Sequence, residues 1–188
     1  MGNRPFISAS GTGKDYYYLF SILNFEDIPI VFAAIDQNNQ IFLCDCVEFR
    51  DIQKWVIAKT DFSILKKVSM QEISVYDALS WDDGTVDFVT LHYNSGEFEH
   101  QNGLPISEMS MEDLPDKDSI IRYPEPDVIE QIQLYSLALT MACLDFAPIG
   151  KTEWYIDTDN QSSKKASTRD YYDVKYHSRI EKSRSVAA

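Results

Sequence analysis

The run IPIVFAAIDQNNQIFLCDCV, residues 28–47, decides the fold of this chain. Its two apolar stretches, 28–35 and 41–47, flank an Asp-Gln-Asn-Asn cluster at 36–39 whose residue types favour tight turns. Apolar stretches of this length around such a turn predict an antiparallel β-hairpin. The first stretch is apolar at nearly every position, which is typical of a central strand covered on both faces.

Stretches rich in aromatic and β-branched residues predict further strands around this hairpin. These strands are predicted over 16–23, 55–59, 86–93 and 97–101. Two short helices are predicted between the second and third of them. One covers 61–68, where apolar residues recur at helical spacing, and the other covers 74–79, which Ser74 and Asp77 open as a capping box.

A longer helix is predicted over 127–144, begun by Asp127 and ended before the Pro-Ile-Gly sequence at 148–150. Its apolar face is wider than a surface helix needs, so the helix either lies deep in the domain or forms a subunit contact. The proline-rich stretch 103–127 before it is predicted to be a connection with a short helical turn at 110–114. These elements predict an α+β fold, a mainly antiparallel sheet with short inserted helices and one long helix of the C-terminal half packed on it.

The composition excludes several classes of protein. A chain of 188 residues fits one domain with an extension, and it is long enough to form a core without disulfides. A net charge of −13 disfavours binding to nucleic acid, because neutralising phosphates requires Lys and Arg. The sequence holds no 18-residue apolar run and no signal-peptide pattern at its start, so we expect a cytoplasmic protein with no membrane span.

The charge is divided unevenly along the chain. Residues 1–160 carry 10 basic and 27 acidic side chains, a net charge of −17, whereas residues 161–188 carry 7 basic and 3 acidic, a net charge of +4. We therefore expect an irregular N-terminal lead over 1–14, one α+β domain over 15–160 and a basic tail over 161–188. A helix in this tail would place Tyr172, Tyr176 and Ile180 on one face at four-residue steps.

No cofactor or metal site is predicted. The three cysteines, Cys44, Cys46 and Cys143, are an odd number without ligand-like spacing, and we interpret them as buried small hydrophobic residues. The Gly-Thr-Gly-Lys sequence at 11–14 lacks the spacing and the following hydroxyl of a phosphate-binding loop. The Asp-Thr-Asp-Asn sequence at 157–160 lacks the later Gly and Glu of a calcium-binding EF-hand.

The leading functional hypothesis is a non-catalytic, acidic protein-interaction module, such as an inhibitor, an immunity or antitoxin-like factor, or an assembly subunit. The stretch 82–130 holds 13 acidic residues against two basic ones, and such a face can dock a basic partner. The expected partner is another protein or a second copy of this chain, which would bind through the basic tail or the 127–144 helix. The candidate interaction residues are Asp82, Asp83, Glu112, Asp113, Asp116, Asp118, Tyr172, Tyr176 and Ile180.

Two alternatives remain open. The first is an enzyme whose site is formed by Asp87, His92 and His100, which would act as an acid–base group if the three side chains converge. The second is a nucleic-acid mimic in which the carboxylates of 82–130 are spaced like phosphates on one face. No nucleophile motif stands beside the histidines, so no catalytic residue is assigned.

The segments LNFEDIPIVF at 23–32, ISVYDAL at 73–79 and DLPD at 113–116 resemble an uncharacterised family of bacterial proteins of unknown function. The resemblance covers about residues 16–120. The chain departs from the family pattern at Ile28, where a glycine is common, and at Tyr76, where a basic residue is common. The resemblance implies a bacterial cytoplasmic protein with an α+β domain, and it brings no catalytic residues.

Overall fold

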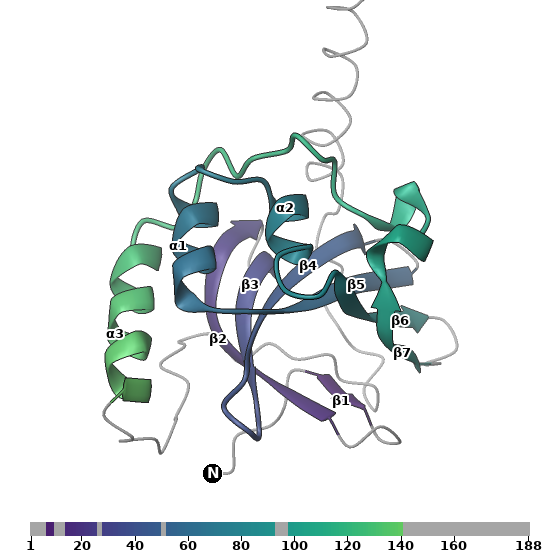
Figure 1. Cartoon of the computed structure of the whole chain (residues 1–188), viewed down its shortest axis with the longest axis horizontal. Coiled ribbons are helices and arrows are strands. Elements are labelled where there is room, and N and C mark those ends of the chain that lie inside the picture. The colour runs from purple at the N-terminus through teal and green to yellow at the C-terminus, as the bar shows by residue number, and fades with distance from the viewer. Residues whose placement is uncertain (1–6, 10–13, 26–27, 50–51, 93–97, 141–188) are drawn as a thin grey trace, which may run out of the picture.

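The computed structural model describes residues 7–9, 14–25, 28–49, 52–92 and 98–140 (Figure 1). Within them, seven strands form one antiparallel sheet in which each strand lies beside its predecessor in the chain. The strands are β1 (Ile7–Ala9), β2 (Lys14–Phe25), β3 (Ile28–Asp36), β4 (Ile41–Phe49), β5 (Ile52–Thr60), β6 (Thr85–His92) and β7 (Phe98–Pro105). The predicted hairpin is β3 and β4, and its central position in the sheet is confirmed.

Helices occupy the two long connections. These are α1 (Phe62–Ser69) and α2 (Val75–Leu79) after β5, then the 3-10 turns η1 (Ile106–Glu108) and η2 (Met111–Asp113) and finally α3 (Val128–Thr140) after β7. Figure 1 shows α1 and α2 over one face of a strongly curved sheet, with α3 beside α1 at its edge. The described part is therefore an α+β fold with short helices, as predicted.

The two faces of the sheet bury different side chains. Phe32, Cys44, Ile57 and Asp87 lie directly opposite one another on β3 to β6 and share one face, which we call the inner face. Their neighbours along the strands, such as Leu43, Ala58 and Val86, share the other face, which we call the helix face because the helices pack on it. Residues of both faces are buried in β3 and β4, which confirms a hairpin covered on both sides.

A bulge in β2 divides its aromatic side chains between the two faces. Tyr18 pairs with Ala34, but Phe20 pairs with Ala33, so Leu19 is an extra residue in the strand. Tyr18 consequently lies near Phe32 on the inner face, whereas Phe20 stacks on Tyr135 of α3, with ring centroids 5.7 Å apart. The bulge thus lets one strand contribute to both layers of the core.

Asp36 and Ser74 act as the sequence predicts, whereas Asp61, which the prediction placed inside the first short helix, caps that helix instead. Asp36 Oδ1 accepts hydrogen bonds from the amides of Asn38 and Gln40, both at 2.8 Å, and closes the hairpin turn. Asp61 is the N-cap of α1, where its Oδ1 accepts from the amides of Ser63 and Ile64. Ser74 caps α2 by accepting from the amide of Asp77 at 3.0 Å.

The structure differs from the predictions at the ends of the domain. Ile7–Ala9, within the lead that was expected to be irregular, forms β1 and pairs with the start of β2. The wide apolar face of α3 is divided, because Val128, Ile132 and Tyr135 are buried while Leu134 and Leu137 are 44% and 59% exposed. The predicted end of this helix, 141–144, and the basic tail lie outside the described residues.

Candidate functional site

The structure brings part of the hypothesised acid–base site together on the inner face. Asp87 of β6 is only 5% exposed, and its Oδ2 accepts a hydrogen bond from the hydroxyl of Tyr16 on β2. Its Oδ1 accepts from the amide of Gly103 on β7 at 2.9 Å, where a backbone φ of +61° suits glycine. Since Tyr16 lies four strands from Asp87 in sheet order, this contact requires the strong curl of the sheet.

The two histidines occupy different environments. His100 lies opposite Val89 and therefore shares the face of Asp87, with its ring centroid 6.4 Å from that of Tyr16. His92 ends β6 five residues beyond Asp87, at a distance of about 17 Å along a strand and on the opposite face. The side chains of Asp87 and His100 therefore approach one group, Tyr16, and His92 does not join them.

Burial on the inner face favours the neutral forms of Tyr16 and Cys44. Burial, followed by the hydrogen bond and the negative charge of Asp87, raises the pKa of Tyr16 well above its ordinary value. Burial also raises the pKa of the Cys44 thiol, with a smaller contribution from the charges of Asp45 and Asp87. A neutral thiol is a poor nucleophile, so Cys44 has the character of a core residue. Cys44 and Cys46 are buried free cysteines on one face, as interpreted from their spacing.

Within the described ranges, no group of three or more His, Cys, Asp or Glu side chains is arranged to hold a metal ion. In the same part of the chain, no helix combines the length and the apolar character needed to cross a bilayer.

The candidate acidic residues fall into two structural groups. Three of them serve local contacts: Asp113 binds Lys54 at 2.7 Å, Asp82 binds Lys59 at 3.2 Å, and Asp83 accepts from the amide and hydroxyl of Thr85.

Glu112 and Asp118 are exposed and have no ion pair among the described residues, and Asp116 is half-buried. The hydrogen bonds from Thr85 lower the pKa of Asp83, so this turn keeps its charge. The candidate tail residues Tyr172, Tyr176 and Ile180 lie outside the described part.

Asp113 takes part in a small charge cluster that ties the connection after β7 to the sheet. Lys54 on β5 contacts Glu48 at 3.1 Å as well as Asp113. Partial burial opposes the charged form of Lys54, but the hydrogen bonds that its ammonium group donates to Asp113 and Glu48 outweigh burial and raise the pKa of Lys54. The ion pair between Asp113 and Lys54 holds η2 against β5, while Met111 and Glu112 of the same turn are exposed.

The connection over 105–127, which we call the outer segment, crosses the outside of α1 and α2 (Figure 1). It is held there by a hydrogen bond from the amide of Val75 to the carbonyl of Ser119 and by one from the side chain of Gln71 to the carbonyl of Arg122. Between these contacts, Ile121 is buried while its neighbour Ile120 is 43% exposed. The segment is thus anchored at intervals, and the side chains on either side of the buried Ile121 are exposed.

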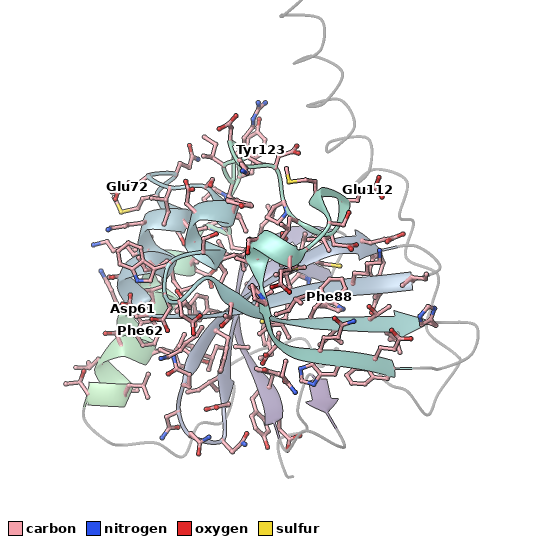
Figure 2. All side chains as sticks on the ribbon, turned by 45° about the vertical axis from the view of Figure 1, so that its right-hand side comes forward. Asp61, Phe62, Glu72, Phe88, Glu112 and Tyr123 are labelled. Atoms are coloured by element: carbon pink, nitrogen blue, oxygen red, sulfur yellow. The ribbon has the colours of Figure 1, made fainter. Side chains whose placement is uncertain are left out.

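Large apolar side chains are exposed where the outer segment meets the end of α1. We call Met70, Ile120 and Tyr123 the outer patch. Met70 precedes Gln71, and the side chain of Gln71 donates a hydrogen bond to the carbonyl of Arg122, the residue before Tyr123. Tyr123 is 83% exposed, and Figure 2 shows it at the crest of the molecule with Glu72 and Glu112 on its two sides. Sequence reasoning missed these three residues, because nothing in the local sequence distinguishes an exposed apolar residue of a connection from a buried one.

Comparison with protein-family models, with curated proteins and with solved structures finds no significant match for this chain.

Proposed function

We propose that this chain is a non-catalytic protein-interaction module of the cytoplasm, and that the outer patch with its acidic surroundings is the surface that binds its partner. The observation that carries the proposal is where the exposed apolar side chains lie. Every large apolar side chain whose exposure the structure describes as high comes from the helices and their connections. They are Met70, Trp81, Met111, Ile120, Tyr123, Leu134 and Leu137.

The chemistry of the outer patch indicates the kind of partner. An aromatic ring, a methionine and a branched aliphatic side chain supply the apolar contact that interface centres typically use. Glu72, Glu112 and Asp118 are exposed around it, and no ion pair neutralises them within the described ranges. A protein surface that presents an apolar anchor surrounded by Lys and Arg would complement both properties.

The same charges argue against the nucleic-acid mimic. A mimic needs a regular array of free carboxylates, but Asp82 and Asp113 are paired with lysines and Asp83 is engaged by Thr85. An apolar patch with a few acidic residues at its rim is typical of a surface that binds a protein, whereas a mimic needs a regular row of carboxylates.

Affinity capture with paired variants tests the proposal. The bait is the full chain, incubated with lysate of the source cells, and bound proteins are quantified by mass spectrometry. Ile120→Ala/Tyr123→Ala removes the patch, and Leu134→Ala/Leu137→Ala removes a similar exposed apolar area on α3 as a matched control. Because truncating a central aromatic residue commonly costs 2 kcal/mol or more, we expect the specific partner to fall roughly 30-fold with the first variant and to remain with the second.

Two results would contradict the proposal. Equal capture by the wild type and both variants would show that the outer patch takes no part in binding the partner. Loss with the α3 variant alone would place the interface on α3 instead. Circular dichroism of each bait before capture shows that the variants are folded.

A further inference from the structure

The outer patch has an occupant of suitable chemistry in the same chain. We propose that the basic tail, residues 161–188, covers the outer patch of its own molecule when no partner is bound. This inference rests on the proposed function, because it concerns the same surface and makes the tail a competitor of the partner. Three observations carry it: the charges, the residue pattern of the tail and the length of chain that precedes it.

The first observation is charge complementarity. The outer segment carries seven acidic and two basic residues, a net charge of −5, whereas the tail carries seven basic and three acidic. Glu108, Glu112 and Asp118 are exposed and lack an ion pair in the described part of the chain. Lys117, one of the two basic residues of the segment, lies over the ring of Tyr76 at 5.2 Å and so faces α2. The free charge presented outward is therefore negative.

The second observation is the distribution of residue types in the tail. An α-helix turns by about 100° per residue, so a helix over 168–183 would place Tyr172, Tyr176 and Ile180 along one side. Arg169 and Arg179 would fall within the same side, Asp173 would border it, and Asp170 and Glu181 would lie on the opposite one. Two arginines against one aspartate leave the apolar stripe with a net positive charge, which complements an apolar patch flanked by carboxylates. Arginine also stacks well on an exposed tyrosine ring such as that of Tyr123.

The third observation is reach. Twenty residues, 141–160, separate the end of α3 from the tail, and in extended form they would span about 66 Å. A globular body of about 140 residues has a radius of gyration of only about 14 Å, so the tether allows the tail to reach any of its surfaces. Tethering gives the tail an effective concentration of the order of millimolar, so a weak intrinsic affinity is sufficient to populate the bound state.

Zero-length carbodiimide crosslinking of the full chain tests the inference. The reagent joins lysine amines to carboxylates in direct contact, and the tail offers Lys164, Lys165, Lys175 and Lys182. Equal amounts of ¹⁴N and ¹⁵N chains are mixed, so that peptide masses separate links within one molecule from links between two. We expect same-isotope links from the tail to Glu108 and Glu72, and fewer of them in 1 M salt, where the screening length falls from about 10 Å at 0.1 M to about 3 Å.

Two variants that change the charge equally provide the control. Glu112→Gln/Asp118→Asn reduces the negative charge of the surface but keeps Glu108 and Glu72, the two carboxylates at which links are measured. Since exposed ion pairs contribute modestly, we expect links at Glu108 and Glu72 to fall about fivefold. Glu99→Gln/Glu130→Gln makes the same change on β7 and α3, both at exposed positions, and should leave these links unaltered.

Each other outcome overturns the inference. Mixed-isotope links would assign the tail to a second copy, and links spread evenly over the exposed carboxylates, or no links, would mean that the tail does not dock here. The proposed function is judged separately by affinity capture. Patch-dependent capture without tail links would refute only the docking of the tail. Tail links without patch-dependent capture would refute only the binding of a partner at the outer patch.

Discussion

Replacing Tyr16 with phenylalanine tests whether one polar contact holds the curl of the sheet. The hydroxyl of Tyr16 donates to Asp87, a buried carboxylate that also accepts a hydrogen bond from the amide of Gly103 at 2.9 Å. The substitution removes one oxygen and keeps the ring, so the packing against Phe42, at a centroid distance of 5.0 Å, is retained. Its effect therefore reports the hydrogen bond rather than a cavity.

The magnitude follows from the charge and burial of the acceptor. Hydrogen bonds to charged groups contribute about 1.5–3 kcal/mol, and a buried carboxylate that loses a donor is not compensated by water. We expect Tyr16→Phe to lower the free energy of unfolding by about 2 kcal/mol. Urea denaturation followed by circular dichroism measures this loss, and an unchanged denaturant slope would confirm that the folded state keeps its compactness.

The adjacent residue is a matched control. Tyr17 pairs with Ile35, so it lies on the helix face, and it is only half-buried. Tyr17→Phe makes the same chemical change without touching Asp87, and we expect less than about 0.5 kcal/mol. The double-mutant cycle of Tyr16→Phe with Asp87→Ala should give a coupling energy of about 1–3 kcal/mol. If Tyr16→Phe behaves like Tyr17→Phe, or the cycle gives no coupling, the reasoning fails.

The pH dependence provides an independent readout. Because burial and the contact with Asp87 raise the pKa of Tyr16, folding favours its neutral form. The stability that this group contributes is present below about pH 10 and is lost as the pH rises further, since only the unfolded chain then ionises there. The loss amounts to as much as about 1.4 kcal/mol per pH unit. The stability of Tyr16→Phe should therefore fall less steeply above pH 10 than that of the wild type.

Three further predictions concern the caps, the layers and the thiols. Asp61→Ala should cost about 1 kcal/mol in urea denaturation, and Asp61→Asn less. Burial opposes the charged form of Asp61, but its cap hydrogen bonds outweigh burial and lower its pKa, so the advantage of Asp over Asn should shrink as the pH falls below about 4 and be lost once the pH has passed the lowered pKa; an advantage that is undiminished at about pH 2 would contradict this. Phe20→Ala should lower the free energy of unfolding by about 3–4 kcal/mol and speed hydrogen exchange in α3, because Phe20 stacks on Tyr135 of that helix; unchanged exchange would show that α3 does not depend on this contact with β2. Cys44 and Cys46 should resist iodoacetamide until urea unfolds the chain, and rapid labelling of the native protein in a peptide map would contradict their burial.

The elements that could be predicted are those with local signals. The hairpin at 28–47 combines two apolar stretches with a turn whose Asp36 binds the amides around it, and all of these residues are close in sequence. The same is true of Ser74, which caps α2 as its sequence pattern predicts. The β1 strand was not predicted, because three residues form a strand only when a partner strand is already in place.

The contacts that could not be predicted are those between distant strands. Nothing near Tyr16 or Asp87 in the sequence indicates that the second and sixth strands meet, since this depends on the total curl of the sheet and on the bulge at Leu19. The outer patch has a similar cause. Ile120 and Ile121 are the same residue type at adjacent positions, and only the anchoring of the outer segment on the helices makes the first exposed and the second buried.

The use of both sheet faces for the core determines where recognition can evolve in this fold. The inner face is covered by the curl of the sheet and the helix face by α1, α2 and α3, so a substitution on either face acts first on stability. The outer segment is different, because a few polar contacts and buried residues such as Leu114 and Ile121 anchor it while the side chains between them face outward. Substitutions at Ile120 or Tyr123 should therefore change this surface without unfolding the sheet. The binding surface that we propose is in this way separable from the core, and comparing the stability of the outer-patch variants with their capture of proteins measures that separation directly.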